Sequence, residues 1–392
     1  MKIQKEKNLL IHEEIDDLLR IRRRIHSHPE LSGHEFQTAA LVAGELRQYG
    51  WNVREGVGKT GIIAEFGEPN SSFVGVRVDM DALPIEEKTG LSFSSSTPGV
   101  MHACGHDIHT TIGLGVAKLI SKIKDLPIGV RILFQPAEEI ASGARWMIAD
   151  GALNDLKALF GVHVCPDLPV GAIGIKRGSL TSAAAELIIE IIGKAGHGAR
   201  PYQSVDAIWA ASKVISGVQE AISRKLNALH PVVITFGKIT GGKTFNVVAD
   251  NVKIIGTVRS PETELFHELP NWLKENVENI AKSCGAESKV SFREIAPPVK
   301  NDEALNEIIL QSARNILDEK EIVQLSYPSM GAEDFAEFLD YVPGAMFRLG
   351  VAASKGCSPL HSSQFNPDED CLKIGIEVLV ESLLTWISSQ QF

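Results

Sequence analysis

The sequence predicts an α/β protein in which a mostly parallel sheet flanked by helices is interrupted by a smaller α+β domain. Strand-like and helix-like segments alternate up to about residue 181, as is typical of a parallel sheet covered on both faces. The next segment has the order strand, helix, strand, strand, helix, strand, which is that of a ferredoxin-like split unit. We therefore expect one domain over 1–181 and 296–392, with the second domain, 182–295, inserted into it.

The first domain begins with an amphipathic helix from Leu9 that closes in the basic run RIRRRIH, residues 20–26. We interpret this run as a solvent-exposed helix face with cations near its C-terminus. A second helix is expected between Gly33 and Tyr49, and Gly50 is its natural stop.

Strands and helices then alternate along the chain. The strands are GIIAEF (61–66), FVGVRV (73–78), IGVRILF (128–134) and KALFGVHV (157–164). A helix follows the stretch MHACGHDIHTT (101–111), and Asp107 is its expected cap. Another helix is expected at 142–149.

The inserted domain begins with the strand ELIIEIIG (186–193) and a helix from 205 to about 222. It continues with strands PVVITFGKI (231–239) and NVKIIGTV (251–258), a helix over 263–283 and the strand KVSFREI (289–295). After the linker APPVKND, helical patterns at 303–317, 332–339 and 371–388 are expected to rejoin the first sheet.

Composition excludes several classes of protein. The 392 residues carry a formal charge of -10, so the basic surface that nucleic acid or an anionic membrane demands is absent from the sequence. No window reaches the roughly 18 apolar residues of a membrane helix, and acids near the N-terminus replace the apolar core of a signal peptide. The five cysteines contain no C-x-x-C pair, which argues against a disulfide framework. We expect a cytoplasmic protein.

Polar side chains fall where predicted strands end. Asp79 and Asp81 follow FVGVRV, QPAEE (135–139) follows RILF, and His163 closes ALFGVH. Because the functional crevice of an open parallel sheet lies outside the carboxyl ends of its strands, three strands deliver acids or imidazole to one edge.

The adjacent acids Glu138 and Glu139 differ in expected role. In an extended segment neighbouring side chains point to opposite sides, so one carboxylate would bind metal while the other faces an attacking water. The alternative is a pair of solvated acids at the start of the next helix.

The stretch MHACGHDIHTT allows three interpretations. Cys104 and His106 offer a thiolate and an imidazole that suit zinc, cobalt or manganese. Cys104 is alternatively a nucleophile activated by His106 or His109, or the stretch is a polar patch with a partly buried cysteine. We expect His102 and His109 to pack beside the ligands rather than bind metal. His361 is isolated in the sequence, as surface or core histidines commonly are.

Several motifs together resemble one family. They are RRRIHSHPELS (22–32), RVDMDALP (77–84), MHACGHDIHT (101–110), FQPAEE (134–139), FGVHVCPDLPVGAI (160–173), GKAGHGARP (193–201), SMGAEDF (329–335) and PLHSSQF (359–365). In this order they resemble the dinuclear metallo-amidohydrolases, which include N-acyl-amino-acid amidohydrolases, hippurate hydrolases and auxin-conjugate hydrolases, relatives of aminoacylase and carboxypeptidase G.

The resemblance implies a catalytic domain with two divalent metal ions (Mn, Zn, Co or Ni) and an inserted lid domain that often forms a homodimer. By position, the implied metal ligands are Cys104, His106, Glu139, His163 and His361. Glu138 matches the general base, and Cys104 stands where other branches place a bridging aspartate.

Other positions are assigned by the same resemblance. Arg77 replaces a metal-binding histidine of other branches, so His106 would supply the imidazole and Asp79 would support the ligands. His197 and Asn246 match lid residues that contact substrate and steady the oxyanion. The commoner N-V-I-P-D form of the second lid motif is here N-V-V-A-D, without the proline.

The implied reaction is hydrolysis of the amide bond of acetyl-, benzoyl- or arylacetyl-amino acids by activated water. Two alternatives remain open from the residues: a hydrolase with Cys104 as nucleophile, which would leave Glu138, Glu139, His163 and His361 unused, and a non-catalytic metal- or ligand-binding protein on the same scaffold.

Overall fold

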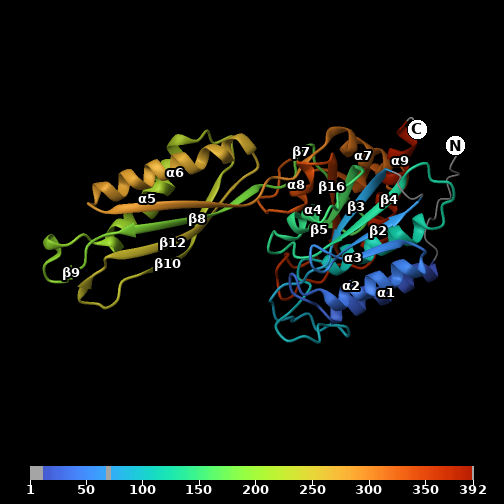
Figure 1. Cartoon of the computed structure of the whole chain (residues 1–392), viewed down its shortest axis with the longest axis horizontal. Coiled ribbons are helices and arrows are strands. Elements are labelled where there is room, and N and C mark those ends of the chain that lie inside the picture. Colours follow the sequence, from blue (N-terminus) through green and yellow to red (C-terminus); the bar gives the residue numbers. More distant parts are fainter. Residues whose placement is uncertain (1–11, 68–71, 391–392) are drawn as a thin grey trace. The chain divides into compact units, whose positions relative to one another are not determined.

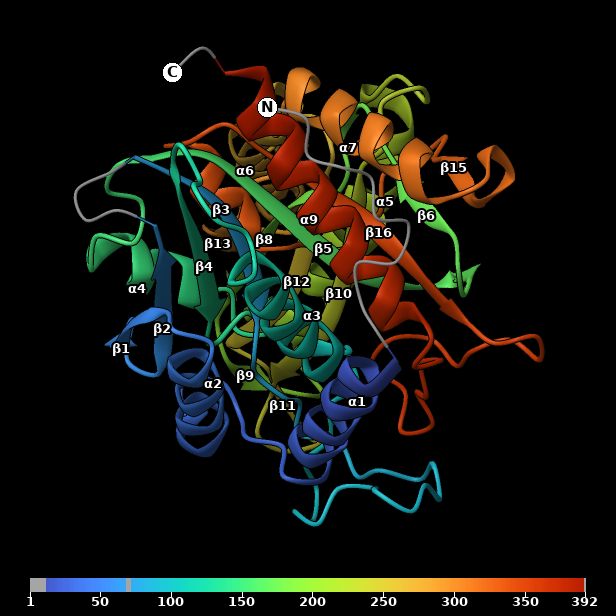
Figure 2. The same cartoon turned by 90° about the vertical axis from the view of Figure 1, so that its right-hand side faces the viewer.

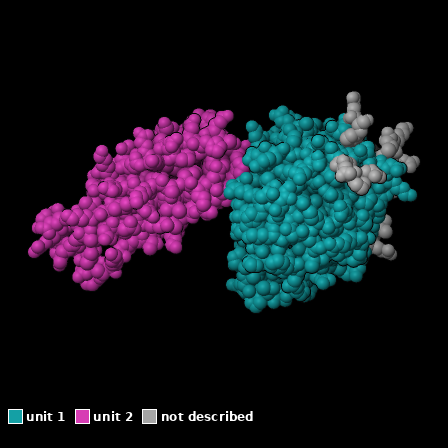
Figure 3. Space-filling view, in the orientation of Figure 1, with its two compact units in different colours: residues 1–178, 300–327, 334–392 teal, residues 179–299, 328–333 magenta. Residues whose placement is uncertain are grey.

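The computed structural model describes residues 12–67 and 72–390, which form two compact units (Figure 3). Unit 1 comprises 1–178, 300–327 and 334–392, and unit 2 comprises 179–299 and 328–333. The sequence instead predicts the domain boundaries at 181/182 and 295/296, and it includes 328–333 in the first domain rather than in the inserted one. The expected helix start at Leu9 lies outside the described residues.

Unit 1 is built on an eight-stranded sheet of order β1-β2-β4-β3-β5-β16-β6-β15. Its strands are β1 (Asn52–Val57), β2 (Gly61–Phe66), β3 (Phe73–Asp79), β4 (Gly129–Gln135), β5 (Leu156–Pro169), β6 (Ile173–Ile175), β15 (Ile322–Gln324) and β16 (Gly344–Ala352). Its helices are α1 (His12–Ser27), α2 (Phe36–Gln48), α3 (His106–Ile120), α4 (Gly143–Ala149), α7 (Glu303–Ile316), α8 (Phe335–Leu339) and α9 (Cys371–Ser389), with a 3-10 turn η2 (Glu319–Glu321). Two short strands lie in the chain where it passes between the units: β7 (Gly178–Ser179) at the junction 178/179 and β14 (Lys300–Asn301) at the junction 299/300.

The centre of this sheet is parallel: β4, β3, β5 and β16 run in the same direction. α3 and α9 pack side by side over one face of it (Figure 2). β3 and β4 are buried along their whole length, as parallel strands with helices on their faces are. The predicted fold class is therefore confirmed.

Close packing of α3 depends on glycine. A Cβ at Gly115 would lie 2.7 Å from Ile376 Cγ1 of α9, and one at Gly113 would lie 2.8 Å from Val78 Cγ2 of β3. The helix thus contacts the sheet on one side and α9 on the other with no room for a methyl group. This contact fixes the position of the α3 N-terminus, where MHACGHDIHTT ends.

The basic run at the end of α1 forms the predicted exposed face only in part, because Arg20, Arg23 and Arg24 are exposed whereas two other basic residues are not. Arg22 and His26 are both fully buried, because they continue the helical stripe of Leu18 and Ile25. Arg22 Nε and His26 Nδ1 each lie 2.8 Å from Asp107 Oδ2. Arg23, in contrast, is exposed and pairs with Glu369.

The expected capping role of Asp107 is also wrong. The N-cap of α3 is Gly105, and no side chain caps the helix there. Asp107 instead points to α1, where the Arg22 guanidinium and His26 imidazole hold the pKa of its carboxyl far below the ordinary value despite complete burial. The ion pair competes successfully with the cap because its partners are charged and buried.

Unit 2 has the ferredoxin-like order that the sequence predicted. Its main elements are β8 (Ala183–Ile192), α5 (Ala207–Lys225), β10 (Val233–Gly241), β12 (Asn251–Ser260), α6 (Thr263–Ser283) and β13 (Glu287–Ala296). Its shorter elements are β9 (Gly196–His197), η1 (Pro201–Gln203) and β11 (Val247–Val248). The sheet is antiparallel with order β10-β12-β8-β13, and α5 and α6 cover one face (Figure 1).

Within the described ranges, no helix has both the length and the apolar character that crossing a membrane requires.

The glycine at position 115 gives a stability prediction. We expect Gly115→Ala to destabilise the protein by about 1–3 kcal/mol, because the added methyl overpacks the contact with Ile376. Gly44→Ala in α2 is the matched control: nothing lies within 4 Å of its Cβ position, so alanine should stabilise the helix by about 0.5–1 kcal/mol. Thermal midpoints from circular dichroism measure both, and equal shifts of the same sign would contradict the packing argument.

Candidate metal centre

The polar residues that the sequence placed at strand ends do meet at one edge of the unit 1 sheet. β3 ends at Asp79, β4 leads into the turn 136–142, and His163 lies in β5. The loop before α3 and the loop carrying His361 complete the edge, since the His361 amide donates to Ala103 O at 2.8 Å.

Two unusual backbone conformations shape these loops. Gly105 has φ +78°, and a Cβ there would lie 2.7 Å from Val164 Cγ2, so only glycine lets the chain turn from Cys104 into α3. His361 has φ +63°, a left-handed conformation that is costly for a non-glycine residue and is common at functional sites.

The five residues predicted as ligands come together as two groups that share Cys104. Cys104, His106 and His163 form one, and Cys104, Glu139 and His361 form the other; within each, the potential ligand atoms lie within 4.8 Å of one another. Cys104 Sγ is 3.6 Å from His163 Nε2. His361 Nε2 is 3.5 Å from Glu139 Oε2, and His106 Nε2 is 3.8 Å from Glu139 Oε1.

Hydrogen bonds orient the imidazoles of this cluster. His163 Nδ1 donates to Val164 O at 2.8 Å, and His106 Nδ1 faces Asp81 Oδ1 at 3.2 Å. Each ring therefore turns Nε2 toward the cluster. His109 has no such nitrogen left, because Nδ1 lies 2.6 Å from Asp79 and Nε2 accepts the Val164 amide at 2.9 Å. Both ring nitrogens of His109 are thus used by protein groups, and its place beside the ligands stays a prediction.

Asp79 and Arg77 form a buried ion pair beneath the cluster. Arg77 Nη1 donates to Asp79 Oδ2 at 2.7 Å, while its other nitrogens reach Gln135 and Asp334 at 2.8 and 3.0 Å. Asp79 lies 3.8 Å from His106 Nδ1, farther than Asp81 does. Arg77 thus joins β3, β4 and the start of α8.

The Glu138 and Glu139 side chains do not point to opposite sides, contrary to the sequence-based expectation. Their carboxylates lie 3.9 and 3.8 Å from the same atom, His106 Nε2. The reason is that the segment is a tight turn rather than extended: Ala137 has φ +53°, and Gly143 closes against the Pro136 carbonyl so tightly that a Cβ could not fit.

Two acids hold this turn: Asp81, which the sequence places at this edge without indicating its contacts, and Glu35, which the sequence does not single out. Asp81 accepts hydrogen bonds from the Glu138 and Glu139 amides at 3.1 and 3.0 Å. Glu35 accepts the Ala137 amide at 2.9 Å. The place of Asp81 after the same strand as Asp79 was a usable signal, whereas nothing in the sequence near Glu35 indicates its contact.

The electrostatics of the cluster suit a divalent cation. Burial raises the pKa of the Cys104 thiol well above its usual range and raises the pKa of Glu139 to about 7. Burial also lowers the pKa of His163. His106 Nε2 and Glu139 Oε1 are buried without a hydrogen-bond partner. Sulfur, imidazole and carboxylate donors in this arrangement fit a divalent metal ion, and such a cation would compensate the buried acceptors.

The two predicted lid residues lie together in unit 2. His197 is in β9 and pairs with Val247 of β11, and the Gly198 amide donates to Asn246 O at 2.8 Å. The loop without the proline still forms this strand pair, with Val248 opposite Gly196. His197 is exposed, and its approach to the cluster of unit 1 stays a prediction.

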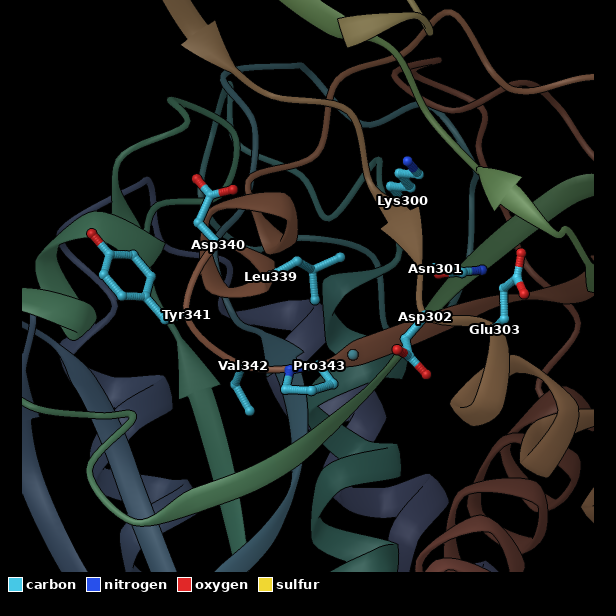
Figure 4. Close-up of a pocket in the computed structure, with 10 residues that line it drawn as sticks. Lys300, Asn301, Asp302, Glu303, Leu339, Asp340, Tyr341, Val342 and Pro343 are labelled. Carbon is cyan, nitrogen blue, oxygen red and sulfur yellow. The ribbon is translucent and has the colours of Figure 1, made fainter.

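A separate surface pocket of about 520 Å³ lies in unit 1 between 300–303 and 339–344 (Figure 4). Its wall includes Gly344, the first residue of β16, which pairs with Leu159 near the start of β5. The pocket is therefore at the amino ends of the parallel strands, opposite the edge where such sheets carry their chemistry. It contains none of the cluster residues.

Comparison with known proteins agrees with this geometry. The chain matches the family model "Peptidase family M20/M25/M40" over residues 75–385. It is 48% identical to a probable hydrolase of Synechocystis sp., covering 92% of this chain and 93% of that protein. It is 38% identical to N-acetyl-L-cysteine deacetylase of Bacillus subtilis, covering 95% and 89%.

A solved structure from Bacillus subtilis, a dinuclear metal-binding peptidase from the M20 family, superposes with a TM-score of 0.84 at 33% identity over 96% of this chain and 99% of that one. Family model, relatives and structure agree, and the chain belongs to peptidase family M20/M25/M40, a family of hydrolases.

Proposed function

We propose that the protein hydrolyses the amide bond of N-acyl amino acids of the acetyl, benzoyl or arylacetyl type in a metal-dependent reaction. The observation that carries the proposal is the pair of ligand groups sharing Cys104 with Glu138 beside them. The deacetylase of Bacillus subtilis supports the substrate class, because its name describes removal of an acyl group from an amino acid.

Two divalent ions, Mn, Zn, Co or Ni, would be held by these groups. The residues that would hold them are Cys104, His106 and His163 in one group and Cys104, Glu139 and His361 in the other. Such ions supply Lewis-acid chemistry: they activate water near neutral pH and polarise an amide carbonyl.

Glu138 is the proposed general base. Its carboxylate lies 3.9 Å from His106 Nε2, and the side chain is nearly buried. Glu138 would accept the proton of the attacking water and pass it to the amine nitrogen, because an amine leaves readily only when protonated. Asp79 would act by positioning, since it holds His109, whose ring in turn accepts the amide next to His163.

Unit 2 would act as a lid. His197 would donate to the developing oxyanion, and Asn246, in the turn just before β11, would contact substrate. A homodimer formed through unit 2 is part of the proposal. β10 and β13 lie at the edges of its sheet, and exposed apolar side chains gather in the same unit: Tyr202, Ile208, Trp209, Ile239, Phe245 and Val247. A cytoplasmic location remains a prediction from the sequence.

A cysteine nucleophile and a non-catalytic binding protein are weaker alternatives. The first leaves Glu138 and the Glu139–His361 pair without a role, although they lie at the same edge as Cys104. The second does not account for a candidate base beside a full set of ligands.

A substrate panel tests the proposed function directly. Acetyl, benzoyl and indole-acetyl amino acids are incubated with protein reconstituted with manganese, cobalt or zinc, and released amino acid is measured. We expect hydrolysis that a chelator abolishes and added metal restores. Activity that persists after complete chelation and is lost on thiol alkylation would instead favour the nucleophile Cys104.

The adjacent acids allow base and ligand to be separated by matched variants. Glu138→Gln should keep both metal ions and lower kcat by about 10²- to 10⁴-fold, because only proton transfer is lost. Glu139→Gln should lose metal, because an amide is a poorer ligand than a carboxylate. Metal content by elemental analysis and kcat distinguish them, and a nearly active Glu138→Gln would show that the assigned base is wrong.

The lid residue gives a prediction confined to unit 2. His197→Ala should lower kcat by about 10²- to 10³-fold through loss of one oxyanion donor, with metal content unchanged. His230→Ala is the control, since this exposed histidine of unit 2 pairs with Glu262. Equal effects of the two substitutions on kcat would contradict the assignment.

A further inference from the structure

We propose that Asp81 is a positioning residue that fixes the base Glu138 and the ligands Glu139 and His106 as one rigid group before metal binds. The inference rests on the proposed function for the roles of these three residues. Its geometry, however, consists of hydrogen bonds within the protein, and it can be measured without substrate.

Asp81 is buried and uses both carboxylate oxygens. Oδ1 lies 3.1 Å from the Glu138 amide and 3.2 Å from His106 Nδ1. Oδ2 accepts the Glu139 amide at 3.0 Å and the Ser32 hydroxyl at 2.6 Å. Four donors match the acceptor capacity of one ionised carboxylate, so the side chain has a single satisfied orientation.

The turn that carries the two acids is shaped to receive this carboxylate. Ala137 adopts the left-handed conformation, and successive backbone N–H groups in such a turn converge into an anion-binding nest. In this protein the anions are its own side chains. Glu35 takes the Ala137 amide, and Asp81 takes the next two. Three consecutive amides of the turn therefore donate to carboxylates from elements far away in the sequence.

Asp81 also touches His106, which couples the turn to α3. Any shift of the turn that moves Glu138 pulls on the same carboxylate that orients the His106 ring. Asp79 does not provide this link, because it lies 3.8 Å from His106 and its hydrogen bonds go to Arg77 and His109. The same Asp81 carboxylate thus sets the position of the base Glu138 and the orientation of the ligand His106.

Asparagine at position 81 would break this arrangement without changing its size. The side-chain amide of asparagine carries a nitrogen that donates, whereas both carboxylate oxygens of Asp81 accept. The four groups that face this carboxylate are all donors. At least one backbone N–H would face another N–H. The turn and the His106 ring should both gain freedom.

The first experiment uses the unmodified, metal-free protein. Hydrogen exchange at the amides of 137–139 should already be slow without metal and should change little when manganese is added. Fast exchange in the metal-free protein that slows only with manganese would overturn the proposal, because the metal rather than Asp81 would then organise the turn.

The second experiment compares Asp81→Asn with Ser32→Ala. Asp81→Asn should speed exchange at 137–139, weaken manganese binding in calorimetry by about 10- to 100-fold, and alter the visible spectrum of the cobalt-substituted protein. Ser32→Ala removes one donor to Asp81 and leaves the turn and His106 contacts, so its manganese affinity should stay within about twofold of the parent.

Parent-like affinity and cobalt spectrum in Asp81→Asn would overturn the proposal. Equal losses in the two variants would do the same, since they would indicate general destabilisation. If instead no N-acyl amino acid were hydrolysed while exchange and metal binding behaved as expected, the proposed function would fail and the positioning role of Asp81 would stand.

Discussion

Burial of charge at the carboxyl edge of the central sheet is the constraint on which unit 1 depends. Arg77, Asp79 and His106 are completely buried, and Asp81 nearly so. A buried charge is tolerated only when it is paired and hydrogen-bonded. Arg77 meets this requirement by reaching Asp79, Gln135 and Asp334, which lie on three separate segments. The contacts that compensate the buried charge of Arg77 therefore also hold these three segments together at the edge of the sheet.

A second buried network repeats this solution between α3 and α1. Asp107 follows the ligand candidate His106 directly and receives Arg22 and His26 from α1. The first turn of α3 is thus anchored on both sides, by Asp81 through His106 and by α1 through Asp107. Because the glycines of α3 allow close contact with β3 and α9, the helix has little freedom to slide. A site assembled in this way needs few adjustments when a metal arrives.

Much of this could be predicted from the sequence. Helical periodicity located α6 at its observed bounds, and the strand ends located the edge where the ligand candidates meet. What escaped prediction depends on tertiary contacts. Because Ala137 adopts the left-handed conformation, the Glu138 and Glu139 carboxylates both lie near the His106 ring, whereas an extended strand would place them on opposite sides. The burial of Arg22 follows the stripe of Leu18 and Ile25, but the charge hid that periodicity. The contact of Glu35 with Ala137 joins residues 102 positions apart, and no local pattern encodes it.

The way unit 2 leaves and rejoins the chain has an evolutionary consequence. Its first long strand, β8, and its last, β13, are antiparallel neighbours, and Ala184 faces Ala296 near the points where the chain enters and exits. A domain whose ends adjoin can be gained or lost by its host through one genetic insertion or deletion, because the host needs only a short bridge to close the gap. Apart from the segment 328–333, unit 1 and unit 2 are thus separable modules, free to diversify at different rates. The sequence of unit 2 can then change while the buried ion pairs of unit 1 stay constant.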